Sequence, residues 1–251
     1  MMVTLALATT ALAQNRVKNI YASSDKLDIE QMQNNDQTVQ LNRFFLAGYN
    51  TLCLPFSLTA EQVAAAAKNL KLERLAGIQQ EDETLNLYFV ECTAEGLQAG
   101  MPYLIYSPIS QYMKVKNTDI LDFDTEVKTV SITDGKGNAV TFSSSWESIE
   151  KMGRYGIPAK QDVTPLESVL LRTEADKIFL PTRCGFTWDE QAPTARELKI
   201  RHAGSMGEVT AIIGVQQDET TSGDYYNLQG QKITEGTKGI RIQKGKKTIA
   251  K

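Results

Sequence analysis

The chain contains few of the residues from which catalytic centres and metal sites are commonly built. Its 251 residues include a single histidine, His202, and three cysteines, none of them in a C-x-x-C spacing. Zinc sites and thioredoxin-like redox motifs therefore have no local support. We expect no catalytic residue, no metal site and no cofactor, and this scarcity favours a binding or structural module over an enzyme.

Positive charge is not in excess either. The 27 basic and 30 acidic residues give a formal charge of −3, which excludes a nucleic-acid binder that depends on overall charge. Residues 223–251 contain seven basic and two acidic residues, a charge of +5, and the preceding residues contain 20 basic and 28 acidic residues, a charge of −8. The near-neutral total therefore hides an acidic body and a basic tail.

Long hydrophobic runs are also missing, because no stretch reaches the roughly 20 apolar residues that span a membrane as a helix. The first 13 residues, MMVTLALATTALA, are apolar, short and uncharged. The small residues Ala11 and Ala13 stand where signal peptidase requires short side chains. The basic residues that usually open a signal peptide are absent, and a buried strand or helix is the alternative. We predict a signal peptide over residues 1–13, cleavage between Ala13 and Gln14, and a secreted or outer-surface location.

An exported chain with three cysteines can form at most one internal disulfide. The sequence leaves open whether Cys53, Cys92 and Cys184 form one. Cys53 lies between two leucines, where a buried thiol usually acts as a small hydrophobic side chain. The fold must therefore depend on its hydrophobic core.

Short runs rich in β-branched and aromatic residues recur over residues 14–213 and predict a mainly β, β-sandwich-like body. The segment Asp134-Gly135-Lys136-Gly137 between two such runs predicts a hairpin. The runs at 168–172 and 178–180 are expected to form another pair. The predicted strands cover residues 17–21, 39–45, 49–56, 85–90, 103–106, 129–133, 138–142, 168–172, 178–180, 198–201 and 209–215.

Two capping boxes predict short helices in this β-rich chain. Thr59 and Gln62 form the first box, and the alanine-rich segment after it predicts a helix over residues 60–71. Ser144 and Glu147 form a weaker box, which predicts a helix that ends near Gly153. A third start signal at residues 164–167 precedes a run that suits a buried strand equally well, and we interpret that run as a strand.

The end of the chain has a different character. Residues 214–223 are polar and acidic, which predicts a linker. After it, glycines separate strand-like runs of four to six residues, the pattern of a small β-module over residues 224–251.

Two motifs resemble a known family. AGYNTLCLPF at residues 47–56, followed by residues 58–62 and by AGMPYLI at 99–105, is similar to a signature of secreted and surface proteins of Bacteroidales bacteria. Residues 226–233 and 238–247 resemble the C-terminal module of the same exported proteins, akin to type nine secretion sorting tails, although Arg241 stands where an aromatic residue is usual. The resemblance implies a β-rich extracellular protein that meets the export machinery through its tail, and it implies no chemistry.

A cysteine–histidine dyad is the sharpest enzymatic hypothesis. It would join Cys184 or Cys92 to His202, because a thiolate nucleophile needs an imidazole within hydrogen-bond reach. Arg183 beside Cys184 is a cation that could lower the pKa of that thiol. A surface histidine and structural thiols are the favoured alternative.

A carboxylate pair is the second enzymatic hypothesis. Asp122 and Asp124 would share one face of a strand, with Glu126 nearby, at a separation that glycoside hydrolysis can use. A solvated strand face is again the favoured interpretation.

Aromatic side chains in polar surroundings indicate a binding role, because sugar rings stack on aromatic faces. The candidate ligand-binding residues are Trp188, Trp146, Tyr155 and Tyr112. Packing of Trp188 over the core is the alternative. We therefore predict an exported, non-enzymatic adhesive or glycan-binding module whose partner is an extracellular glycan or a host or cell-surface component. The alternative is an extracellular hydrolase that acts on polysaccharide or peptide.

Overall fold

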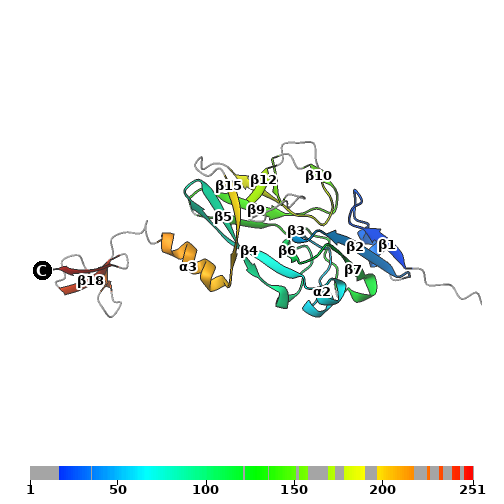
Figure 1. Ribbon diagram of the computed structural model, residues 1–251, viewed down its shortest axis with the longest axis horizontal. Helices are drawn as coiled ribbons and strands as arrows, with labels where there is room; N and C mark the ends of the chain where they lie inside the picture. Colours follow the sequence, from blue (N-terminus) through cyan, green and yellow to red (C-terminus); the bar gives the residue numbers. More distant parts are fainter. Residues whose placement is uncertain are drawn as a thin grey trace, which may run out of the picture.

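The protein is mainly β, with three α-helices among the residues described (Figure 1). The structure is a computed structural model. It describes residues 17–34, 36–120, 122–134, 136–150, 153–157, 169–172, 178–189 and 197–217, and in the tail 225–226, 232–233, 239–243 and 246–250. Its strands surround two apolar cores, so the predicted mainly β fold with short helices is confirmed. Within these ranges no helix has both the length and the apolar character needed to span a membrane.

Ten strands form one sheet in the order β3-β6-β4-β5-β15-β12-β11-β14-β9-β8. All neighbouring strands pair antiparallel except β5 and β15, which are parallel. The sheet is strongly curled, so that its β9 end comes close to β4. There the Asn138 side chain, next to β9, donates to the Gln80 side chain of β4 over 2.9 Å. The strands are β3 (Gly48–Leu52), β4 (Lys71–Glu81), β5 (Thr84–Glu91), β6 (Tyr103–Ser107), β8 (Val130–Thr133), β9 (Ala139–Ser143), β11 (Tyr155–Gly156), β12 (Val169–Arg172), β14 (Gly185–Asp189) and β15 (Glu197–Ala203).

The inside of the curled sheet holds the first apolar core. Phe142 and Phe186 stack with their ring centroids 4.3 Å apart, and Phe89 meets both rings edge-on. Phe142 and Phe186 are opposite each other on β9 and β14, so the stack joins two strands from distant parts of the chain. The predicted hairpin at residues 134–137 connects β8 to β9 and is confirmed.

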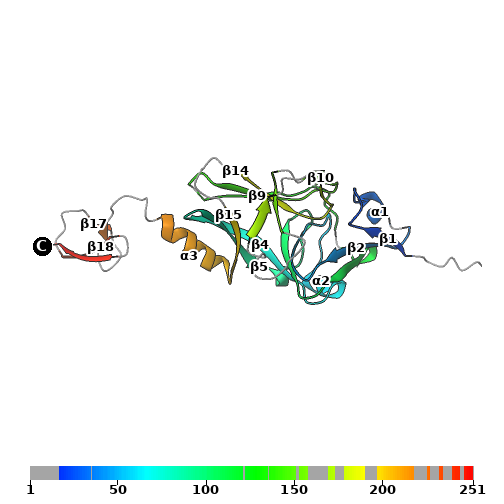
Figure 2. The same cartoon turned by 45° about the horizontal axis from the view of Figure 1, so that its top comes forward.

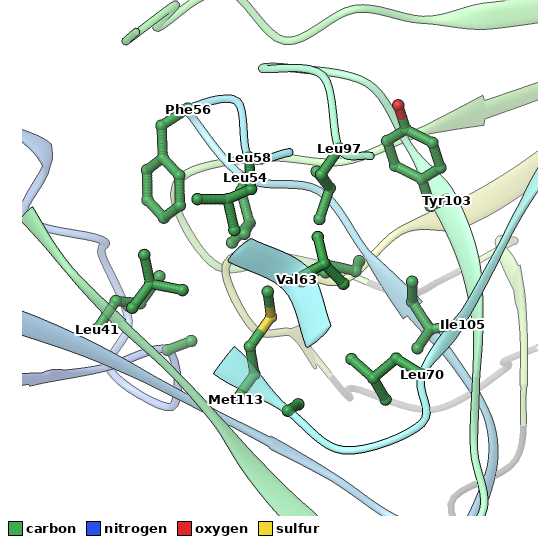
Figure 3. Packing of buried hydrophobic residues seen from close by; sticks show 14 of the residues in the cluster. Leu41, Leu54, Phe56, Leu58, Val63, Leu70, Leu97, Tyr103, Ile105 and Met113 are labelled. Carbon is green, nitrogen blue, oxygen red and sulfur yellow. The ribbon is translucent and has the colours of Figure 1, made fainter. Parts of the chain in front are cut away.

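A second core lies between the curled sheet and a three-stranded sheet made of β1 (Lys18–Tyr21), β2 (Val39–Phe45) and β7 (Gln111–Lys116). Two short helices, α1 (Ile29–Gln33) and α2 (Ala60–Ala66), contribute buried residues to it. Figure 3 shows Val63 of α2 surrounded by side chains of both sheets and of the loops between them. The 3₁₀ turns η1 (Thr93–Glu95) and η2 (Asn117–Asp119) flank this region.

Helix α2 begins with the predicted capping box. Thr59 Oγ1 accepts from the Gln62 amide over 3.2 Å, and Gln62 Oε1 accepts from the Thr59 amide over 2.8 Å. The helix ends at Ala66 and not at residue 71, because Asn69 takes a positive φ of 51° and β4 starts at Lys71.

The two segments of the N-terminal motif, residues 47–62 and 99–105, contact each other. Leu58 and Leu97 exchange two backbone hydrogen bonds of 2.8 Å, and the Gly100 amide donates to the Leu54 carbonyl over 2.8 Å. Residues 52–54 are fully buried, with Leu54 facing the second core and Cys53 the first. The segments on which the predicted resemblance depends are therefore joined by backbone hydrogen bonds.

The helix predicted from Ser144 is wrong. Backbone groups of this segment bond to residues 25–27, including Leu27 N to Trp146 O over 2.8 Å and Ser148 N to Asp25 O over 2.7 Å. The chain then forms β10 (Ile149–Glu150), which pairs with β13 (Ile178–Phe179). The predicted pairing of residues 168–172 with 178–180 is wrong too, because β12 pairs with β11 and β15.

The strand predicted over residues 209–215 is a helix, α3 (Met206–Gln217). Ser205 Oγ accepts from the Glu208 amide over 3.2 Å, so Ser205-x-x-Glu208 is the capping signal in the sequence that indicates this helix. The helix lies against β4 and β15 at one end of the curled sheet (Figures 1 and 2). Val209 and Ile213 fit over Gly77 of β4, where a side chain would occupy their place.

The last strands form a four-stranded sheet in the order β17-β16-β18-β19, in the segment where the sequence predicted a small β-module. They are β16 (Tyr225–Tyr226), β17 (Lys232–Ile233), β18 (Gly239–Gln243) and β19 (Lys246–Ala250). Residues 214–217 belong to α3, so the predicted linker cannot begin at 214. The rest of that linker, the predicted signal peptide and its cleavage site lie outside the described residues.

Candidate functional site

The four aromatic residues predicted to bind a ligand do not form one surface. Trp188 is 9% exposed and Tyr155 7% exposed, and both belong to the core inside the curled sheet. Trp146 is half-buried between the two cores, where its indole donates to the Thr125 carbonyl over 2.7 Å. Only Tyr112 is well exposed, at 47%. The other three rings are held by packing, because burying them stabilises the fold.

An open hollow lies where the first core meets solvent. On β15 the inward positions are Leu198, Ile200 and then His202, and the strand alternation brings His202 to the mouth of the curled sheet. The inward side chains of β3, β4, β5 and β6 also change from apolar to polar toward the mouth, and Phe89 of β5 lies where this change occurs. The hollow has a volume of about 560 Å³, and its lining residues are Tyr49, Lys71, Glu73, Phe89, Glu91, Tyr106, His202, Ala203 and Gly204.

Three aromatic rings line one side of this hollow. The His202 imidazole stacks on Tyr49 with centroids 4.8 Å apart and an interplanar angle of 17°. Tyr106 follows on the neighbouring strand, with its centroid 5.2 Å from that of Tyr49. The rings form a short aromatic row along the mouth.

The imidazole is oriented by a buried carboxylate. Glu73 Oε2 lies 2.6 Å from His202 Nδ1, and the Glu73 side chain is only 8% exposed, against 41% for His202. A carboxylate acceptor beside Nδ1 favours a proton on that nitrogen of the ring. The pair therefore fixes the orientation of the most accessible polar ring of the hollow.

A second carboxylate, that of Glu91, lies beside the Glu73–His202 pair. Glu91 is directly opposite Glu73 on β5. Its carboxylate lies 3.6 Å from Lys71 Nζ and accepts from Thr93 Oγ1 over 3.1 Å. The mouth thus combines hydrogen-bond acceptors and donors with aromatic faces, the composition of a site for a polar ring ligand.

The cysteine–histidine dyad is wrong. Cys184 and Cys92 are buried and do not line the hollow, whereas His202 bonds to Glu73. Burial raises the pKa of Cys92 to about 11 and that of Cys184 to about 12, and it also raises the pKa of Cys53. At neutral pH these thiols are protonated and poor nucleophiles.

We therefore expect the folded chain to resist thiol reagents. With a chromogenic disulfide reagent at neutral pH, labelling of the native protein should be at least about a hundredfold slower than labelling in denaturant. The unreduced, denatured chain should show three thiols, because all three cysteines are free in the structure. A count of one would reveal a disulfide, and rapid labelling of native Cys184 or Cys92 would contradict the burial argument.

The carboxylates at residues 122–126 lie outside the strands of the sheets, in a segment where Phe123 forms an isolated antiparallel bridge with Phe56. Asp124 accepts from the Glu126 amide over 3.0 Å and pairs with Lys128 Nζ over 3.0 Å, and these two contacts lower the pKa of Asp124. Asp122 and Asp124 do not line the hollow described above. Among the described residues, no three His, Cys, Asp or Glu side chains are placed to hold a metal ion.

Comparison with known proteins yields no relative. No family model matches the chain, no curated protein is similar to it, and no solved structure matches its fold. The hollow and the exposed surfaces are therefore the features from which function can be inferred.

Proposed function

We propose that the chain is an exported, non-enzymatic module that binds a carbohydrate in the hollow at the mouth of the curled sheet. The observation that carries this proposal is the row of Tyr49, Tyr106 and His202 rings beside the two carboxylates. The apolar C–H face of a sugar can stack on such rings. Its hydroxyl groups can bond to the carboxylates and the ammonium group, which fix the orientation of the ligand.

Export is supported by the sequence. The apolar first 13 residues fit a signal peptide, and the motifs resemble those of secreted and surface proteins of Bacteroidales bacteria. We propose that the C-terminal module meets the export machinery, and that the ligand belongs to an extracellular glycan or to a host or cell-surface component. Adhesion would follow from glycan binding.

The arrangement favours binding over hydrolysis. A glycoside hydrolase of the common two-carboxylate type needs one carboxyl group that keeps a proton for the leaving group. Glu73 is bonded to His202, and Glu91 lies beside Lys71 and accepts from Thr93, so both carboxylates face donors.

We expect Tyr49→Ala and His202→Ala each to weaken binding of the best neutral oligosaccharide about tenfold, because each removes one ring of the stack. A glycan array on the full chain identifies that ligand, and isothermal titration calorimetry measures the affinity. Arg201→Ala is the matched control. Arg201 precedes His202 on β15, points to the other face of the sheet and bonds to Asn86.

Three results would contradict this proposal. The affinity could be unchanged in both variants, no member of the array could bind, or incubation with the bound oligosaccharide could release new reducing ends. New reducing ends would show that the protein is a hydrolase and not a binding module. Loss of the reducing ends in Glu73→Gln or Glu91→Gln would then assign that activity to the hollow.

A further inference from the structure

The three-stranded sheet presents a second surface, which we name the outer face. Side chains of β1, β2 and β7 alternate between the buried core and the opposite side of the sheet. Val39, Leu41, Met113 and Val115 take the core positions. The outer face consists of Asn19, Tyr21, Gln40, Asn42, Phe44, Tyr112, Lys114 and Lys116.

Strand register arranges these residues in rows. Tyr112 lies opposite Phe44, Lys114 lies opposite Asn42, and Lys116 lies opposite Gln40. On the other side of β2, Tyr21 lies beside Asn42, and Asn19 lies beside Gln40. Successive rows are about 6.8 Å apart along the strands. The outer face therefore changes from aromatic at one end to amide and ammonium groups at the other.

The aromatic end is exposed to solvent. Tyr21 is 48% exposed, Phe44 42% and Tyr112 47%. The rings of Phe44 and Tyr112 contact each other with centroids 5.0 Å apart and remain open on their outer sides. Exposed rings grouped in this way mark interaction sites more often than isolated surface hydrophobic residues do.

The amide groups at the centre are held in a fixed ladder. Asn42 Nδ2 donates to Asn19 Oδ1 over 3.0 Å, and Gln40 Nε2 donates to Asn42 Oδ1 over 2.9 Å. Within the described part of the chain, Gln40 Oε1 and Asn19 Nδ2 have no hydrogen-bond partner. An acceptor and a donor thus remain available on a preorganised surface, which lowers the entropy cost of binding.

The charge of the outer face is opposite to that of the body. Lys114 and Lys116 are exposed, and none of the eight outward residues is acidic. The chain before residue 223 nevertheless has 28 acidic and 20 basic residues. A locally positive face on an acidic body attracts a polyanion, and it would place lysines against lysines if two copies met through this face.

We propose that the outer face binds an acidic polysaccharide. Tyr112, Phe44 and Tyr21 stack against sugar rings, the amide ladder bonds to hydroxyl groups, and Lys114 and Lys116 pair with carboxylate groups along the polysaccharide. This surface is made of other strands than the hollow and takes a ligand of another charge, so it is a site in addition to the one proposed above. Tyr112 is the one predicted ligand-binding residue that it includes.

The test is affinity electrophoresis of the full chain in gels that contain polygalacturonate or neutral dextran. We expect retardation by polygalacturonate, little retardation by dextran, and binding that weakens as salt increases. The double variant Lys114→Gln/Lys116→Gln should weaken binding to polygalacturonate at least tenfold, and Tyr112→Ala about fivefold. The matched control, Lys68→Gln/Lys199→Gln, makes the same charge change elsewhere. His202→Ala should have no effect, because it alters only the hollow.

Other outcomes would overturn the proposal. Equal weakening in both double variants would show unspecific charge attraction, and unchanged binding in all variants would place the polysaccharide elsewhere. A dimer at high concentration that Tyr112→Ala abolishes would assign the outer face to a second copy of the chain. Circular dichroism establishes that each variant is folded, which is expected because none of the substituted side chains is buried.

Discussion

Gly100→Ala is expected to lower the free energy of unfolding by about 3 kcal/mol. Gly100 has φ +75°, a conformation that costs any residue with a Cβ atom, and a Cβ there would overlap the Glu126 carbonyl oxygen. Its own backbone is fixed on both sides, because its amide bonds to Leu54 O over 2.8 Å and its carbonyl accepts from Lys128 N over 2.9 Å. The backbone cannot move aside without breaking one of these bonds. Urea unfolding followed by tryptophan fluorescence measures the change.

Gly153→Ala is the control for this prediction. Gly153 has nearly the same positive φ of +71°, but no atom of the described residues lies within 4 Å of the position of its Cβ. We expect a loss of about 1 kcal/mol, which isolates the backbone conformation from the collision. Equal losses in the two variants would show that contact with Glu126 costs nothing.

Phe186→Ala is expected to cost about 3–5 kcal/mol, the range for truncating a fully buried aromatic side chain. The ring is completely buried, stacks on Phe142 at 4.3 Å and meets Phe89 edge-on. Its removal leaves a cavity that the neighbouring strands β9 and β14 cannot close without losing their pairing register. Urea unfolding should show a lower midpoint with little change in slope.

Phe44→Ala provides the matched control for this core variant. Phe44 is 42% exposed on the outer face, so we expect a change of about 0.5 kcal/mol or less. A loss at Phe44 as large as that at Phe186 would contradict the assignment of Phe44 to an exposed face and of Phe186 to the core. The same variant should weaken binding to polygalacturonate, because its ring lies beside Tyr112.

The two segments of the N-terminal motif, residues 47–62 and 99–105, contact each other through backbone groups, which is a structural role. Leu54 of the first segment receives the amide of Gly100 of the second, and Leu58 bonds to Leu97 between them. Tyr49 is the one motif residue that also lines the hollow. These backbone contacts identify no ligand, and the hollow and the outer face are the surfaces on which one is proposed.

Strand β4 shows why part of the fold could not be predicted. Its sequence KLERLAGIQQE has one β-branched residue and spaces its leucines irregularly, so its local pattern does not predict a strand. The register shifts between Leu75 and Gly77, where α3 presses on the strand. Hairpin pairing with β5 and longer-range pairing with β6 make this segment a strand and override its local preference.

The amino-acid sequence by itself determined the mainly β class, the hairpin at residues 134–137, the cap of α2 and the strand-forming tail. Each of these features depends on residues that are neighbours in the chain, so rules for turns, helix caps and strand alternation can predict it. The hollow was decided only by the tertiary structure. Tyr49, Glu73, Glu91, Tyr106 and His202 lie on five different strands, and no local rule relates them. They meet because curling of the sheet brings the ends of these strands to one mouth, where apolar inward positions give way to polar ones.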